Sequence, residues 1–191
     1  RPAPHFDTRE GRWLGVPSWP SKSIKEDTYF FNGNRLSSIQ NKTTINTQLT
    51  VSSPQTTGIH GGEWCAYGLG KVAPELPLDQ REDDSGSLIF DGDPLLKAIS
   101  IVGEGRVRLN ISSDVPQCLI AVRLNNIHPN GTVERISYGV LNLSHRESNE
   151  NPDPLTSNKF YEVTVRLKGV AQVVPKGHQL RISVSTSYWP L

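Results

Sequence analysis

The last two-thirds of the chain is a run of short segments in which apolar and polar residues alternate, and the final segment shows the pattern most clearly. From residue 179 to residue 184 the apolar set is Leu180, Ile182 and Val184, and the polar set is Gln179, Arg181 and Ser183. An alternation with a period of two indicates a β-strand that buries one face. The sequence therefore predicts that the apolar set lies in the core and that the polar set faces away from it.

The same alternation, interrupted by turns such as Asn32-Gly33-Asn34 and Pro129-Asn130-Gly131, predicts about ten strands. The expected strands cover residues 28–31, 87–90, 97–102, 105–112, 119–126, 133–143, 160–167, 171–174 and 177–185, and residues 35–52 are expected to add a weak strand or two, around 45–51. Strands without intervening helices exclude a parallel α/β sheet. An antiparallel jelly-roll β-sandwich of the galactose-binding-like kind buries alternating faces and hides its edges, so the fold class is predicted as all-β.

The predicted core is the set of apolar residues that alternate with polar neighbours. Its members are Leu109, Ile111, Ile120, Val122, Leu124, Val163, Val165, Leu180, Ile182 and Val184. A chain of 191 residues can form one such domain, because β-sandwiches commonly reach about 200 residues. We expect residues 1–25 to form an irregular N-terminal arm and residues 26–191 to form the sandwich.

Residues 53–86 contain little strand pattern, and such long loops are often functional. We expect the glycine-rich stretch 58–70, with Trp64 and Tyr67, to form a docking surface together with the arm that carries Trp13 and Trp19. The alternative, in which this loop folds back over its own sandwich, stays open.

The charge balance argues against two classes of partner. The chain has 20 basic and 19 acidic residues, and no run of Lys or Arg exceeds two neighbours. Nucleic acids and anionic membranes select a concentrated basic surface, so neither is expected. No apolar stretch approaches the roughly 20 residues of a membrane span, and no signal peptide is visible, which favours the cytoplasm and leaves secretion open. Homo-oligomerisation also stays open.

The chain begins with Arg1 and contains no Met, so we expect a piece of a longer protein or a processed form. The two cysteines, Cys65 and Cys118, fit no metal or redox spacing. Two separate buried thiols are the favoured interpretation and a disulfide is the alternative.

Familiar catalytic patterns are missing from the sequence. It contains no Gly-x-Ser-x-Gly elbow, no glycine-rich phosphate loop and no His-Glu-x-x-His zinc helix. The five histidines are scattered, and His178 is assigned a structural or surface role. The acidic run 79–84, with Asp91 and Asp93 nearby, is interpreted as a solvated loop in preference to a calcium site. No catalytic, cofactor-binding or metal-binding residue is therefore predicted, and no cofactor is expected.

The large aromatic residues allow two interpretations. They are Trp13, Trp19, Trp64, Tyr67, Tyr188 and Trp189. A row of exposed aromatic rings would form a platform for sugars or another ligand. Packing against the core or against a neighbouring domain is the commoner role and is favoured here.

Several segments occur in a characteristic order from about residue 13 to the end of the chain. They are Trp19-Pro20, Asp79-Gln80-Arg81, Leu88-Ile89-Phe90, Asp93-Pro94-Leu95, and residues 99–103, 122–131, 138–141 and 177–185. As an ordered set they resemble the C-terminal domain of the X-Pro dipeptidyl-peptidase and cocaine-esterase-like (CocE/NonD) serine hydrolase family. Asn125-Asn126-Ile127 is a minor departure, since that family often has Asp-Val there.

The resemblance implies a jelly-roll domain that is joined to an α/β-hydrolase domain and packs against it. In such proteins the Ser-His-Asp triad lies in the hydrolase domain, so no catalytic residue is carried over to this chain. The leading hypothesis is a non-catalytic accessory domain that shapes the surroundings of an active site in the missing hydrolase domain. The competing hypotheses are a carbohydrate- or ligand-binding module and, least favoured, an independent enzyme.

Overall fold

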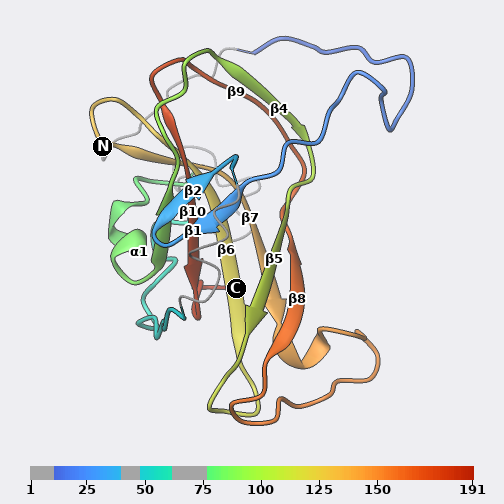
Figure 1. The fold of residues 1–191 in the computed structure, drawn as a ribbon, viewed down its shortest axis with the longest axis vertical. Helices are drawn as coiled ribbons and strands as arrows, with labels where there is room; N and C mark the ends of the chain where they lie inside the picture. Colours follow the sequence, from blue (N-terminus) through green and yellow to red (C-terminus); the bar gives the residue numbers. More distant parts are fainter. Residues whose placement is uncertain (1–10, 40–47, 62–76) are drawn as a thin grey trace.

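A computed structural model describes residues 11–39, 48–61 and 77–191, and within these ranges the chain is almost entirely β (Figure 1). The strands are β1 (Phe30–Asn32), β2 (Arg35–Ser37), β3 (Leu88–Asp91), β4 (Ile99–Gly103), β5 (Arg106–Ile111), β6 (Leu119–Ile127), β7 (Val133–Asn142), β8 (Tyr161–Arg166), β9 (Val170–Val174) and β10 (Gln179–Ser185). The helical elements are a single turn of α-helix, α1 (Arg81–Ser85), and a 3-10 turn, η2 (Leu143–His145).

Six strands form the larger sheet, in the order β1-β2-β3-β10-β6-β7. The last strand in the chain, β10, lies in the middle of this sheet and pairs antiparallel with both β3 and β6. The pairing of β6 with β7 is antiparallel and is interrupted by a bulge between Leu124 and Asn125. A parallel bridge at Arg35 and Asp91 attaches the β1–β2 hairpin to this sheet.

The remaining four strands form a second layer. β4 pairs antiparallel with β9, and β5 pairs antiparallel with β8. Figure 1 shows that β4 leads into β5 and that β8 leads into β9, so the two pairs follow one another as a long bent ribbon. This ribbon lies against one face of the six-stranded sheet, while α1 lies on the opposite side of that sheet.

The core fills the space between the sheet and the ribbon. Of the ten residues that the sequence predicts there, seven are buried, and the other three, Leu109, Ile111 and Leu124, are partly buried and pack against the core. The predicted core is therefore confirmed. Additional core side chains come from outside the alternating set and include Phe90, Val107, Leu143, Leu155 and Val174.

The predicted all-β class with antiparallel sheets is confirmed, and most predicted strands occur within two residues of their expected bounds. The exception is the weak strand or two expected within residues 35–52. β2 covers residues 35–37 there, residues 48–51 are not in a strand, and residues 40–47 lie outside the described ranges. The jelly-roll topology, the likeness to galactose-binding domains and the domain division at residue 25 stay predictions. In the part of the chain that the structure describes, no helix is long and apolar enough to cross a membrane.

Candidate functional site

The central strand of the larger sheet is buried on both faces, contrary to the sequence prediction. Leu180, Ile182 and Val184 face the core as expected. On the other face, Ser183 and Ser185 are completely buried and Arg181 is largely covered. A polar side chain can be buried at low cost only when its hydrogen-bonding groups find partners. The partners of these side chains therefore define a candidate polar site.

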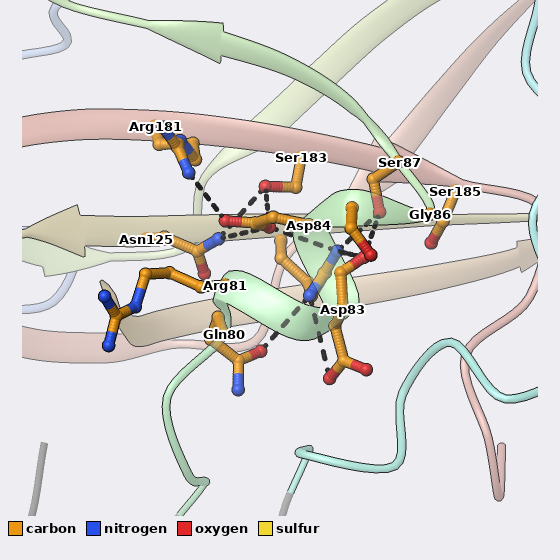
Figure 2. Close-up of polar contacts among 12 residues, drawn as sticks. Gln80, Arg81, Asp83, Asp84, Gly86, Ser87, Asn125, Arg181, Ser183 and Ser185 are labelled. Carbon is orange, nitrogen blue, oxygen red and sulfur yellow. Dashed lines mark hydrogen bonds and ion pairs between the residues drawn. The ribbon is translucent and has the colours of Figure 1, made fainter. Parts of the chain in front are cut away.

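The acidic run provides these partners, so its interpretation as a solvated loop is wrong. Residues 81–85 form α1, and both Asp83 and Asp84 are buried against the outer face of the sheet. The Asp84 carboxylate accepts a hydrogen bond of 2.6 Å from the Ser183 hydroxyl and one of 3.4 Å from the Asn125 amide. Figure 2 shows Asp84 pointing toward side chains of two neighbouring strands, β6 and β10.

Arg123 is completely buried, and its guanidinium binds α1 and the residues on either side of it. Its Nη2 donates hydrogen bonds to the Ser87 hydroxyl at 2.6 Å and to the Asp83 carbonyl at 3.0 Å, and its Nη1 donates to Oε1 of Gln80 at 3.3 Å. Nη2 also lies 3.3 Å from Oδ1 of Asp84. A guanidinium presents five donors in a fixed plane, so one side chain can satisfy several acceptors of a short helix together.

Arg181 joins α1 to the adjacent strand β3. Its Nη1 donates to Asp84 at 2.9 Å, and its Nε and Nη2 donate to the two oxygens of Asp91 at 2.5 and 2.7 Å. Burial by itself lowers the pKa of Arg181, but the hydrogen bonds and charges of Asp91 and Asp84 outweigh it and raise the pKa. The bidentate pair with Asp91 is the geometry in which Arg and carboxylate bind most strongly.

Asp83 connects α1 to the segment 48–61. Its carboxylate accepts hydrogen bonds from the backbone N–H groups of Gly58 at 2.8 Å and His60 at 3.2 Å. Gly58 has a φ of +109°, and an added Cβ would lie 2.3 Å from the backbone nitrogen of Trp189, so only glycine fits there. The N–H of Leu78 donates to the carbonyl of His60 at 3.0 Å. The two ends of the stretch between His60 and Leu78 are thus held together.

Residues 58–61, the part of the glycine-rich stretch that the structure describes, therefore pack on the domain itself, against α1. For these residues the alternative, in which the loop folds back over its own sandwich, agrees with the structure, and the expected docking surface does not. The remainder, 62–70 with Trp64 and Tyr67, lies outside the described residues.

Residues near the end of the chain also pack over this face of the sheet. Tyr188 is buried, and its hydroxyl is hydrogen-bonded by Nη1 of Arg135. The Arg135 guanidinium also lies 4.6 Å from the ring centre of Tyr138, which is a cation–π distance. Burial raises the pKa of Tyr188, while the positive charge of Arg135 acts in the opposite direction. The network thus extends from α1 through β6 and β10 to β7.

A second, smaller polar cluster lies near one end of the larger sheet. Nδ1 of His178 is 2.9 Å from Oδ1 of Asn126, and the amide of Asn126 donates to Glu134 at 3.2 Å. His128 lies 3.3 Å from the same Glu134 oxygen, and the His128 and His178 rings are 4.7 Å apart. Burial, followed by the charge of His128, lowers the pKa of His178. The structural role assigned to His178 agrees with these contacts.

Neither cluster has the arrangement of a hydrolytic centre. In residues 11–39, 48–61 and 77–191, no serine hydroxyl is hydrogen-bonded to a histidine ring. His60 contacts Glu82 at 3.1 Å and Asp83 at 3.7 Å, both of them carboxylates. No group of three or more His, Cys, Asp or Glu side chains within these ranges is arranged to hold a metal ion. What the main network can do chemically is hold α1 and segment 48–61 against the sheet.

The described aromatic residues do not form one platform. Tyr188 is buried, whereas Trp13, Trp19 and Trp189 are exposed. Trp19 lies over Gly103, at the end of β4, and the backbone of Trp189 is bonded to Thr57. Cys118 has a free, half-buried thiol whose pKa is raised mainly by burial, and Cys65 lies outside the described residues.

A model of the X-Pro dipeptidyl-peptidase C-terminal non-catalytic domain matches residues 5–191. The chain therefore belongs to this family of non-catalytic, all-β domains. The order of segments quoted from the sequence, and the resemblance that it carries, are confirmed by this match.

The similar proteins of known name are hydrolases several times longer than this chain. The cocaine esterase of Rhodococcus sp. (strain MB1 Bresler) is 22% identical over 93% of the chain and 32% of the esterase. The Xaa-Pro dipeptidyl-peptidase of Ligilactobacillus salivarius (strain UCC118) is 23% identical over 93% of the chain and 26% of the peptidase. The chain thus spans about a third of the length of these relatives or less.

Solved structures show the same fold. An aminopeptidase from a marine sediment archaeon, Thaumarchaeota archaeon, superposes with a TM-score of 0.75 at 18% identity, over 94% of this chain and 32% of the aminopeptidase. An α-amino acid ester hydrolase superposes with a TM-score of 0.72 at 22% identity, over 88% and 30% of the two chains. In each case the chain corresponds to less than a third of the neighbour.

Proposed function

We propose that this chain is the accessory domain of a longer serine hydrolase, in which it packs on an α/β-hydrolase domain and shapes the surroundings of the active site there. One observation carries the proposal. The family of non-catalytic C-terminal domains matches residues 5–191, while the named esterase and dipeptidyl-peptidase relatives are about three times as long as the chain or longer. The chemistry proposed for the longer protein is cleavage of an ester, amide or Xaa-Pro peptide bond through an acyl-enzyme.

The segment that precedes β1 supports this proposal. Residues 11–20 are exposed throughout, and in the described ranges no hydrogen bond joins them to a strand. They carry Trp13 and Leu14, both exposed, and Trp19. Large apolar side chains gathered on an exposed segment mark a surface that another domain covers. We therefore assign residues 11–20 to the contact with the hydrolase domain.

The first test separates the accessory domain from an independent enzyme. The chain of 191 residues should not hydrolyse p-nitrophenyl esters or Xaa-Pro nitroanilides above background, and the longer protein encoded by the same gene should. Saturable turnover by the 191-residue chain that survives repurification would overturn the proposal. A reading frame that encodes no hydrolase domain would overturn it as well.

The second test addresses the contact. Trp13→Ala in the longer protein should shorten the half-life of activity on heating, since Trp13 has no cover within the described chain. Phe160→Ala is the matched control, because Phe160 is an exposed aromatic residue beside β8, far along the chain from residues 11–20. Equal behaviour of the two variants would remove residues 11–20 from the contact. A sugar-binding module is less well supported, because the described exposed tryptophans lie on different elements.

A further inference from the structure

The ribbon formed by β5 and β8 exposes three arginines on the face that points away from the core. Arg106 and Arg108 alternate with the buried Val107, and the strand register places Arg166 directly opposite Arg106. All three arginines are exposed. Within the described part of the chain, none of them forms an ion pair, a side-chain hydrogen bond or a ring contact.

Apart from Arg12 in the exposed segment 11–20, the other arginines of the described residues are bound. Carboxylates hold most of them: Arg35 pairs with Asp93, Arg81 with Asp79, Arg123 with Asp84, Arg146 with Asp153, and Arg181 with Asp84 and Asp91. Arg135 binds the hydroxyl of Tyr188. Three unpaired arginines on one surface thus depart from the way in which the rest of the domain uses this residue.

This arrangement works against the stability of the isolated domain. Like charges that face each other across two paired strands repel, and Arg106 and Arg166 do so directly. The outward-facing positions of β5 and β8 include a single carboxylate, Glu162, which is opposite Asn110 and not opposite an arginine. A repulsion that the domain does not relieve by itself is relieved when a carboxylate-bearing surface covers it.

We propose that Arg106, Arg108 and Arg166, the arginine face, dock onto a carboxylate-bearing surface of the hydrolase part of the longer chain. This inference rests on the proposed function. A guanidinium presents a planar pair of donors that matches a carboxylate, which favours an acidic protein surface as the partner. Nucleic acid is disfavoured, because the whole chain has a net charge of only +1. About two-thirds of the cocaine esterase lies outside the part that this chain matches, and a tethered partner needs little affinity at each contact.

Cross-linking in the longer protein tests this docking directly. Replacing the three residues by lysine, Arg106→Lys, Arg108→Lys and Arg166→Lys, keeps the charges and introduces amines. A zero-length carbodiimide couples these amines to any carboxylate in contact with them, and peptide mass spectrometry identifies the partner. Arg35→Lys is the positive control, because Arg35 is paired with Asp93 inside the domain. The unsubstituted protein provides the background, since guanidinium groups do not couple.

The expected result is a set of new cross-links from positions 106, 108 or 166 to Asp or Glu residues outside the 191 residues. Two results would overturn the inference. One is cross-links to Glu104 or Glu162 of the same domain alone. The other is no new cross-link while the Arg35→Lys control reacts with Asp93.

A charge reversal provides a second readout. Arg108→Glu in the longer protein should lower the midpoint of its first thermal transition, and high salt should abolish the difference, because about 1 M salt screens exposed charges beyond roughly 3 Å. Lys176→Glu, in the exposed turn before β10, is the matched control. An equal effect of Arg108→Glu on the 191-residue chain alone would show an effect on folding and overturn the docking. Loss of binding to a single-stranded oligonucleotide, in place of the thermal effect, would also overturn it.

The two proposals can fail separately. If Trp13→Ala destabilises the longer protein, while the lysine variants give no cross-link outside the 191 residues and Arg108→Glu behaves like Lys176→Glu, the accessory-domain proposal stands and the arginine face is excluded from the contact. If the gene encodes no hydrolase domain, both fail together.

Discussion

The hydroxyl of Ser183 donates a hydrogen bond of 2.6 Å to Oδ1 of Asp84, across 99 residues of sequence. Ser183 lies in the middle strand of the larger sheet, and Asp84 lies in the single turn of helix that covers this sheet. The contact places an acidic helix over a strand face on which Ser183 and Ser185 have no exposed area. It explains why a domain with an apolar core on one side of this sheet also depends on ion pairs on the other.

Arg123→Met should destabilise the domain by about 3–5 kcal/mol, the usual cost of removing one partner from a buried ion pair. Arg123 is completely buried, and its removal takes the nearby guanidinium away from Asp83 and leaves Asp84 with Arg181 as its remaining cation. Urea unfolding measures the change. Arg35→Met is the control, because the Arg35–Asp93 pair is exposed and such pairs contribute about 0–1 kcal/mol. Similar losses for the two variants would contradict the structural role of the network.

Ile182→Ala should cost about 2–5 kcal/mol, the range for truncation of a buried isoleucine. Ile182 belongs to the core and lies in the strand that pairs on both sides. The free energy of unfolding in urea is again the measurement, with Val173→Ala as the control, since Val173 is 52% exposed on β9. A loss below that of the control would show that the register of β10 is different.

Gly139→Ala should destabilise the domain by about 1–3 kcal/mol, because the added methyl group has no space. Its Cβ would lie 2.0 Å from the carbonyl oxygen of Arg166, a backbone atom that cannot move without shifting the end of β8. Gly169→Ala is the matched control, since the nearest atom to a Cβ there is Cγ of Glu104 at 3.8 Å. Thermal unfolding of the two variants should therefore differ. Equal midpoints would show that β7 and the end of β8 are farther apart.

His178 should make the domain less stable in mild acid. Its pKa in the fold lies below the ordinary 6.5, so between these two values the unfolded chain binds more protons than the folded chain. The stability from neutral His178 is fully present above pH 6.5 and is lost as the pH falls through the folded pKa. The charged and titratable groups that face His178 are His128, which lowers its pKa, and Glu134, which raises it.

Urea unfolding at several pH values between about 7.5 and 5 checks this expectation. In His178→Gln the loss of stability over this interval should be smaller than in the unsubstituted chain, because one group that takes up a proton only on unfolding is gone. An unchanged pH dependence would mean that other groups are responsible.

The sequence predicts the core side of the sheet well, because alternation records which residues avoid water. Leu180, Ile182 and Val184 are in the core for this reason. The same alternation assigns Arg181 and Ser183 to the opposite face, but it does not show whether that face is exposed to solvent or covered by another segment. Their burial depends on α1, which is about 100 residues earlier in the chain.

The prediction that the acidic run is a solvated loop is wrong for a related reason. Asp83 and Asp84 are buried because Arg123 and Arg181 lie beneath them, and a local charge pattern contains no information about residues 40 to 97 positions away. The sequence does contain one indication that this face of the sheet is covered. The polar positions of the two central strands hold small or multivalent hydrogen-bonding residues, Arg123, Asn125, Ser183 and Ser185, which suit a covered face better than the lysines and glutamates of an exposed one.

The position of β10 has a consequence for synthesis of the domain. Until residues 179–185 have left the ribosome, β3 with its β1–β2 hairpin and the β6–β7 pair have no strand between them. Each group is too small to bury its apolar face, so the nascent chain carries two unpaired sheet edges between the synthesis of residue 142, where β7 ends, and that of the final segment. The sheet closes in one late step, when the final segment enters between them, and a ribosome that stalls shortly before that segment holds an incomplete sheet that chaperones would have to shield.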